Sequence, residues 1–205
     1  MTGPTHKKCA ISFAFIFVIL LYRDAELSIN YYLLLLIILE MSKKGALFPD
    51  LDHSWHNISE KTVPNRIVNA IIRFTRGKHR SWQTHSIDIC TYFTITALYL
   101  PNILFNLNRI SELNKEILSA VLIGFASGWI SHLFSDMLTP EGVRLICFSR
   151  IKLKFVPKRL FKFKFSTGSS WEEFIYKSVN CINYILGFIA LVYPYIGNII
   201  TLIAY

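Results

Sequence analysis

Residues 117–138 read ILSAVLIGFASGWISHLFSDML, and this apolar stretch decides the fold. It is long enough to span a bilayer, which takes about 20 residues of helix. Near its end, His132 and Asp136 are four residues apart, so a helix of 3.6 residues per turn places both on one face, where both can reach one cation. A hydrogen-bonded His and an Asp at a helix end would also explain the pair, so the rest of the chain has to decide.

Composition places the chain among membrane proteins. Hydrophobic residues make up 53% of its 205 residues and aromatic residues 15%, and the mean hydropathy is +0.40. A soluble domain of this size does not need so much apolar surface. The four Cys residues are far apart and form no C-x-x-C pair, so we interpret them as small apolar packing residues rather than a redox or zinc-finger motif.

Five apolar runs follow one another along the chain, at about residues 9–22, 27–41, 86–105, 117–138 and 180–204. They predict an all-α membrane protein with about five membrane-embedded helices in a single domain, residues 1–205. The first two runs are shorter than a full span. The first meets Arg23 and Asp24 without a small-residue cleavage site, so we do not interpret it as a signal peptide.

Positive charge separates by membrane side. Nineteen of the 22 Lys and Arg residues lie before the first run, in residues 41–85 or in residues 137–179. The positive-inside rule therefore predicts a multi-pass protein with its N-terminus in the cytoplasm. A soluble loop that binds nucleic acid would also concentrate charge but would not alternate with the spans, so a nucleic-acid partner is not expected.

Two basic segments on this side are predicted to lie on the bilayer, which makes membrane lipids an expected partner. Residues 62–76 form an amphipathic helix, with Ile67 and Ile71 on the apolar face and Asn69 with the arginines on the other. Residues 151–165 alternate cations with apolar residues around a Pro-Lys turn signal, which predicts a small basic hairpin. Ser170 then begins a capping-box pattern that predicts the start of the last helix.

Ligand-type side chains collect at the same side of the predicted membrane. Seven of them lie at four helix ends that alternating spans bring together: His6, Asp50, Asp52, His79, His85, His132 and Asp136. Imidazole nitrogens mixed with carboxylate oxygens favour Zn²⁺, or Mn²⁺, over Ca²⁺ or Mg²⁺. Seven candidates exceed one tetrahedral site, so one ion with supporting His–carboxylate pairs and two ions sharing a carboxylate both remain open.

Residues near these candidates are predicted to support the site. Asp88, one turn beyond His85, is expected to orient that imidazole. His53 belongs either to the supporting residues or to the loop, and His56 is assigned to the loop.

These residues resemble those of the YdjM-like family of LexA-binding, inner-membrane-associated proteins. The resemblance covers roughly residues 2–175, and it rests on the following elements in order: Thr5-His6, Gly45, Pro49-Asp50-Leu51-Asp52-His53, His79-Arg80, Thr84-His85-Ser86, Gly128, Ser131-His132, Asp136, Thr139-Pro140 and Gly142-Val143. It implies a multi-span inner-membrane protein of a family regarded as metal-dependent hydrolases. The His132 and Asp136 spacing is also similar to a zinc-ligand pair of the soluble zinc-dependent phospholipase C and single-strand nuclease superfamily. The chain departs from the YdjM-like pattern at residues 144–147, Arg-Leu-Ile-Cys, where the family often has Trp-Pro.

Metal-assisted hydrolysis at the cytoplasmic interface is the function that this pattern favours. We expect Asp50 to be a ligand and Asp52 to take the proton from water, with Arg80 binding an oxygen of a phosphoester that is small or lipid-linked. An alternative uses Ser81 or Ser86 as a nucleophile, but it leaves most ligand-type residues unused.

Two further classes of function stay open. A cation or proton transporter would use the intramembrane His and Asp residues, although it would need polar groups at the other face as well. A regulatory membrane protein would bind a protein partner, which the sequence does not identify, and would hold a structural metal in a closed set of ligands.

Overall fold

Helices build nearly the whole structure, a computed structural model that describes residues 3–22, 29–58, 60–75, 77, 80, 82–139, 141–149, 151–155 and 170–203. The long helices are α1 (Gly3–Leu21), α2 (Ile29–Leu47), α4 (Ile87–Asn106), α5 (Glu112–Met137) and α6 (Ser170–Ile203). The short elements are η1 (Pro49–Asp52), η2 (Trp55–Asn57), α3 (Val63–Phe74), β1 (Val143–Arg144) and β2 (Lys152–Leu153). The predicted all-α class is confirmed.

Four of the long helices are long and apolar enough to cross a membrane: α1, α4, α5 and residues 170–192 of α6. The remaining long helix, α2, has 19 residues like α1 but carries Glu40, Lys43 and Lys44 near its C-terminal end. These charges explain why its apolar part is short. Helix α1 begins at Gly3 rather than near residue 9, and this brings His6 into its first turns.

Glycines let α5 pack directly against α2. A Cβ atom on Gly128 would lie 1.9 Å from the carbonyl oxygen of Ser42, and one on Gly45 would lie 2.0 Å from the carbonyl oxygen of Phe125. Gly124, one turn before Gly128, faces the backbone of Ile38 in the same way. Small residues at this spacing allow two membrane helices to approach closely. The close approach fixes α5 relative to α2 at the level of His132.

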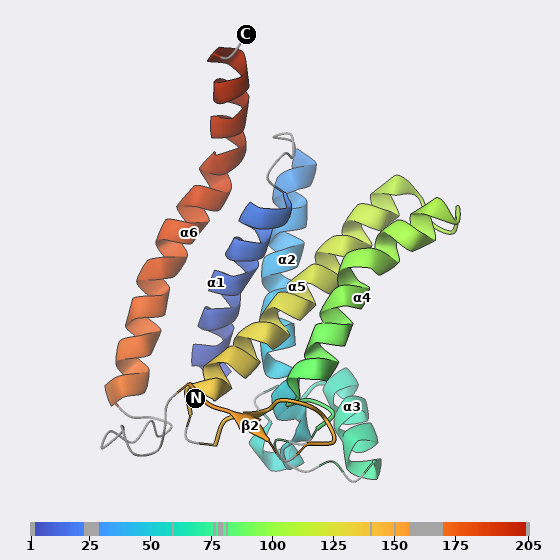
Figure 1. The fold of residues 1–205 in the computed structure, drawn as a ribbon, viewed down its shortest axis with the longest axis vertical. Coiled ribbons are helices and arrows are strands. Elements are labelled where there is room, and N and C mark those ends of the chain that lie inside the picture. Colours follow the sequence, from blue (N-terminus) through green and yellow to red (C-terminus); the bar gives the residue numbers. More distant parts are fainter. Residues whose placement is uncertain are drawn as a thin grey trace.

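One end of the bundle gathers the functional segments. The N-terminus of α1, the C-termini of α2 and α5 and the N-termini of α4 and α6 all lie there, together with α3 and the strands (Figure 1). Hydrogen bonds close this end: the hydroxyl of Thr5 donates to Glu172 at 2.9 Å, joining α1 to α6. Glu60 accepts from Lys7 of α1 at 2.7 Å and from Lys44 of α2 at 3.0 Å. These hydrogen bonds, from Lys7 first and Lys44 second, hold the pKa of Glu60 below its usual value.

The amphipathic helix forms where it was predicted, but Asn69 does not face solvent. Helix α3 begins after Thr62, whose hydroxyl accepts from the backbone N–H of Asn65. Asn69 is buried, and its amide donates to the carbonyl oxygens of Leu51 and His53, the latter at 2.9 Å. The polar side of the helix therefore binds the loop that carries η1.

Part of the predicted basic hairpin forms a strand, β2. β2 pairs antiparallel with the upstream strand β1, with Val143 opposite Leu153 and Arg144 opposite Lys152. The predicted second arm, residues 156–165, lies outside the described residues. Gly142 precedes β1 with φ +65, a backbone conformation that side chains rarely adopt, and a Cβ there would lie 2.5 Å from the carbonyl oxygen of Leu153.

Candidate metal centre

His132 lies at the centre of the site, on the last turns of α5, and is fully buried. Its Nδ1 lies 2.7 Å from the carbonyl oxygen of Ala46 at the end of α2. A carbonyl oxygen only accepts, so Nδ1 carries the proton and Nε2 presents a lone pair. Nε2 has no hydrogen-bond partner among the described residues. A buried nitrogen without a partner is costly, which marks this atom as a candidate ligand.

Two carboxylates face this nitrogen at equal distance. Oδ2 of Asp136, one turn along α5, lies 3.8 Å from Nε2 of His132, and Oδ1 of Asp50 in η1 also lies 3.8 Å from it. Asp136 is buried, whereas the side chain of Asp50 is 27% exposed. The predicted pair on one face of α5 is therefore joined by a carboxylate from a separate element.

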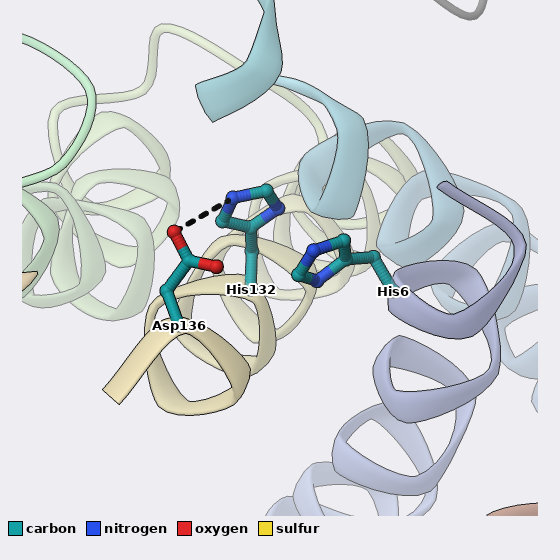
Figure 2. A group of neighbouring side chains, drawn as sticks. All are labelled: His6, His132 and Asp136. Carbon is teal, nitrogen blue, oxygen red and sulfur yellow. Dashed lines mark ion pairs between the residues drawn. The ribbon is translucent and has the colours of Figure 1, made fainter. Parts of the chain in front are cut away.

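His6 completes the cluster from α1. Its ring stacks on the ring of His132 with centroids 4.0 Å apart, and its Nδ1 has no hydrogen-bond partner among the described residues. Figure 2 shows His6 reaching from α1 toward His132 and Asp136 on α5. Ligand atoms of these three side chains lie within 4.8 Å of one another.

His85 enters from the loop before α4. Its Nε2 lies 3.6 Å from Oδ2 of Asp136, while its Nδ1 lies 3.0 Å from Oδ2 of Asp52. The hydroxyl of Thr84 donates to the same oxygen of Asp52 at 2.8 Å. Asp52 is fully buried behind His85, on the side of the ring away from Asp136. A carboxylate in this place fixes the tautomer and orientation of an imidazole.

Arg80 closes the site at its edge. Its Nη2 lies 3.3 Å from Oδ2 of Asp136, and Nη1 donates to the hydroxyl of Thr139 at 3.2 Å. Its Nε is buried and makes no hydrogen bond to any described residue. The nearest carboxylate oxygen that forms an ion pair with it, Oε2 of the exposed Glu141, lies 3.3 Å away but is not aligned for a hydrogen bond. Arg80 also has φ 58, which is unusual for a residue other than glycine. Strain of this kind is maintained where surrounding contacts fix it, often at functional sites.

Asp88 makes other contacts than the predicted one with His85. The two carboxylate oxygens of Asp88 accept from the backbone N–H groups of Cys147 and Ile89, at 3.0 and 2.9 Å. Asp88 therefore holds the loop after β1, and Asp52 takes the place beside His85 that was expected for Asp88. His53 ends η1 through its backbone, and His79 lies outside the described residues.

Ser86, one of the two alternative nucleophiles, is not placed for that role. The hydroxyl of Ser86 donates to the carbonyl oxygen of Trp82 at 2.7 Å rather than to an imidazole. Ser81 lies outside the described residues.

Some supporting groups carry no sequence signal. The carbonyl of Ala46 is a backbone group, so composition cannot indicate its contact with His132. Trp129 donates from its indole to the carbonyl oxygen of Thr84 at 2.9 Å and so positions the segment before α4. Its buried indole N–H needed an acceptor, which is the one clue that the sequence offers.

A divalent cation fits these side chains. Ligand atoms about 2.0–2.2 Å from one ion are separated from each other by roughly 3–4 Å. The separations of 3.6 and 3.8 Å among His85, His132, Asp50 and Asp136 agree with this range and are long for hydrogen bonds. Asp50, His85 and His132 form a second group with ligand atoms within 4.8 Å, sharing His132 with the first.

Among the described residues, the groups of side chains that could hold a metal ion are found at one end of the molecule only. Both groups that could hold an ion include His132, and neither the middle of the bundle nor its far end has another among those residues. A cation path would need a second group of this kind further along the span, so this arrangement favours an interfacial site.

Comparison with known proteins identifies the family. The model of the YdjM inner membrane protein family matches residues 1–201. The chain belongs to this family. Membership, together with the apolar helices, supports a location in the membrane.

A curated relative adds little about function. The chain is 27% identical over 111 residues to the uncharacterized protein YvsG of Bacillus subtilis (strain 168), which is 54% of this chain and 56% of YvsG. The chain thus spans about half the length of that relative. No solved structure matches the chain.

Proposed function

We propose that the protein is a metal-dependent hydrolase that cleaves a phosphoester at the cytoplasmic face of the inner membrane. One observation carries the proposal: three imidazoles and two carboxylates from four separate segments converge around the buried, unpartnered Nε2 of His132. Such a set is costly to bury without a cation, which supports a metal centre.

The chain supplies an oriented set of ligands. A bound divalent ion lowers the pKa of water toward about 7 and polarises the scissile group. Ala46 fixes the proton of His132 on Nδ1, and Asp52 does the same for His85, so that both Nε2 atoms face Asp136. His6, His85, His132 and Asp136 are the proposed ligands, with zinc as the first candidate and manganese as the second.

The two carboxylates of η1 take different roles in this proposal from those that the sequence suggested. Asp52 is buried and receives hydrogen bonds from His85 and Thr84, so it serves as a positioning residue. Asp50 is partly exposed and lies 3.8 Å from Nε2 of His132, so it can exchange a proton with water at the mouth of the site. Asp50 is therefore the proposed general base.

Arg80 supports an anionic substrate. Its guanidinium contacts Asp136, and among the described residues its buried Nε lies near the exposed carboxylate of Glu141 without a hydrogen bond. An anionic phosphate oxygen that replaces Glu141 would satisfy this donor and lie next to the ligands. The position at the ends of membrane helices favours a lipid-linked phosphoester, and the net charge of +9 also favours an anion.

Two matched variants test the proposal. Asp50→Asn should keep bound metal but lower phosphodiester turnover by roughly 10²- to 10⁴-fold, the scale of general-base loss. Asp52→Asn should instead weaken metal affinity by about 10- to 100-fold, because His85 loses its orienting partner. Both are measured in detergent or lipid by metal content and by hydrolysis of phosphodiester and phosphomonoester substrates.

Glu112→Gln, an exposed carboxylate at the far end of α5, is the control and should change neither quantity. The reverse pattern, with metal lost in Asp50→Asn and turnover alone lost in Asp52→Asn, would restore the sequence-based assignment. A metal-loaded wild-type protein that hydrolyses no phosphoester would contradict the proposed activity.

A further inference from the structure

Helix α3 presents an apolar face that nothing in the described structure covers. Val63 is 73% exposed, Ile67 56%, Ile71 58% and Phe74 90%. At 3.6 residues per turn these four side chains share one side of the helix. Removing these four apolar side chains from water would be favourable, so we expect another surface to cover this face of α3.

The opposite side of α3 is attached to η1. Ile72 packs with Leu51 and Ile58 in a small apolar cluster, and Val68 lies beside it. Asn69 adds two hydrogen bonds to the carbonyls of Leu51 and His53, which bracket Asp52. Beneath α3, a cavity of about 250 Å³ separates its Asn65 and Val68 from Phe125 of α5. The helix is therefore held chiefly through η1.

The position and charge of α3 identify its partner. It lies at the end of the bundle where the membrane helices begin and end, and extends beyond that end (Figure 1), on the side where lipid headgroups are expected. Arg66 and Arg73 lie along one flank of the exposed apolar face, an arrangement that suits a helix lying in an anionic membrane surface. A second protein copy would not need the flanking arginines.

We propose that the exposed face of α3 docks on an anionic phospholipid surface, and that Asn69 transmits this docking to η1 and thereby holds Asp50 and Asp52 in place. The claim that docking matters for the metal centre rests on the proposed function, because it takes Asp50 and Asp52 as residues of that centre. The docking of α3 on lipid does not depend on the proposed function. The bilayer is thus part of the structure that positions the metal centre.

Hydrogen–deuterium exchange tests docking without any measurement of hydrolysis. The full chain is reconstituted in nanodiscs of phosphatidylcholine alone, or of three parts phosphatidylcholine to one part phosphatidylglycerol. In the anionic nanodiscs, amides of residues 63–74 and 49–53 should exchange about 10- to 30-fold more slowly, the scale expected for two arginines near an anionic surface. Equal rates in the two lipids would overturn the proposal.

Variants separate the docking of α3 on lipid from its effect on η1. Ile67→Glu with Ile71→Glu should abolish the lipid dependence in both segments, and both positions are exposed, so folding is not at risk. Leu107→Glu, 61% exposed beyond the other end of α4, is the matched control and should retain it. A double variant that behaves like wild type would refute docking.

Asn69→Ala should keep the slow exchange of residues 63–74 in anionic lipid but lose it for residues 49–53. If both segments stay slow in Asn69→Ala, transmission through Asn69 is wrong. If exchange in α3 slows with protein concentration and not with lipid charge, the face binds a second copy of the chain and the proposal fails.

Discussion

Replacing Gly128 by Ala should disturb the metal centre from a distance. The new Cβ would lie 1.9 Å from the carbonyl oxygen of Ser42, whereas ordinary contact begins near 3.4 Å. Helix α5 would have to move away from α2 by roughly 1–1.5 Å, an over-packing that costs about 1–3 kcal/mol. His132 lies one turn further along α5, and its 2.7 Å contact with Ala46 would lengthen beyond a hydrogen bond.

Losing that hydrogen bond leaves a buried donor unsatisfied, which costs about 1–3 kcal/mol more. The expected destabilisation is therefore roughly 2–6 kcal/mol, as the sum of the two terms. Metal affinity should fall by about 10- to 100-fold, the usual effect of removing a partner that orients a metal-binding His. Thermal unfolding in detergent gives the first quantity, and metal titration gives the second.

Gly187→Ala provides the matched control. A Cβ at Gly187 would lie 3.1 Å from the ring edge of Phe15, a side chain that can move, rather than from backbone. This variant should retain both stability and metal. If Gly128→Ala were as stable as Gly187→Ala and bound metal equally well, the close contact of α2 and α5 would not be what positions His132.

Three further predictions concern the metal centre, the ion pairs of Glu60 and the orientation in the membrane. His132→Ala should remove most bound metal while the protein stays inserted, and His56→Ala, on an exposed side chain of η2, should leave metal content unchanged; equal metal in both would refute the site. Glu60→Gln should lower the melting temperature at pH 7, because the folded state holds the pKa of Glu60 below its usual value and the ionised carboxylate stabilises the fold. The difference in melting temperature from wild type should shrink as pH falls below about 4.5, because protonation of Glu60 removes that stabilisation. Reporter fusions after residue 160 should give a cytoplasmic signal and those after residue 110 an external one, and a cytoplasmic signal after residue 110 would contradict the orientation.

Local periodicity was sufficient to predict several parts of the molecule. The spacing of His132 and Asp136 placed them on one face of a helix, and the faces of residues 62–76 predicted α3 with its exposed apolar side. Alternation of the spans predicted that His6 and His85 would meet at one end of the bundle, and both now lie in ring contact with His132. These features follow from the helical repeat and from the alternation of membrane spans, and contacts with distant residues hardly change either of them.

Pairings between distant segments could not be predicted in the same way. The alternation at residues 151–155 indicated a strand, but a two-residue strand carries too little pattern to reveal that it pairs with β1 upstream. The left-handed backbone of Arg80 has no marker either, because no glycine or asparagine stands there.

The two carboxylates of η1 show why their roles stayed open. Residues two apart point in different directions, but which of them turns inward depends on the 3₁₀ turn and on Asn69, which holds the carbonyls on either side of Asp52. That contact comes from a helix whose polar face was expected to lie in solvent. Asp52 could therefore be placed beside His85 only once the packing of α3 was known.

The glycines of the family pattern connect the fold to the site. Gly45 and Gly128 carried part of the resemblance without any chemistry of their own. In the structure, a Cβ at either position would lie about 2 Å from the backbone of the facing helix, so only glycine fits there. Their absence of side chains brings the carbonyl of Ala46 within 2.7 Å of His132 and so selects the tautomer that exposes Nε2. A ligand deep in an apolar helix can be oriented by backbone alone, provided that two helices are allowed to touch.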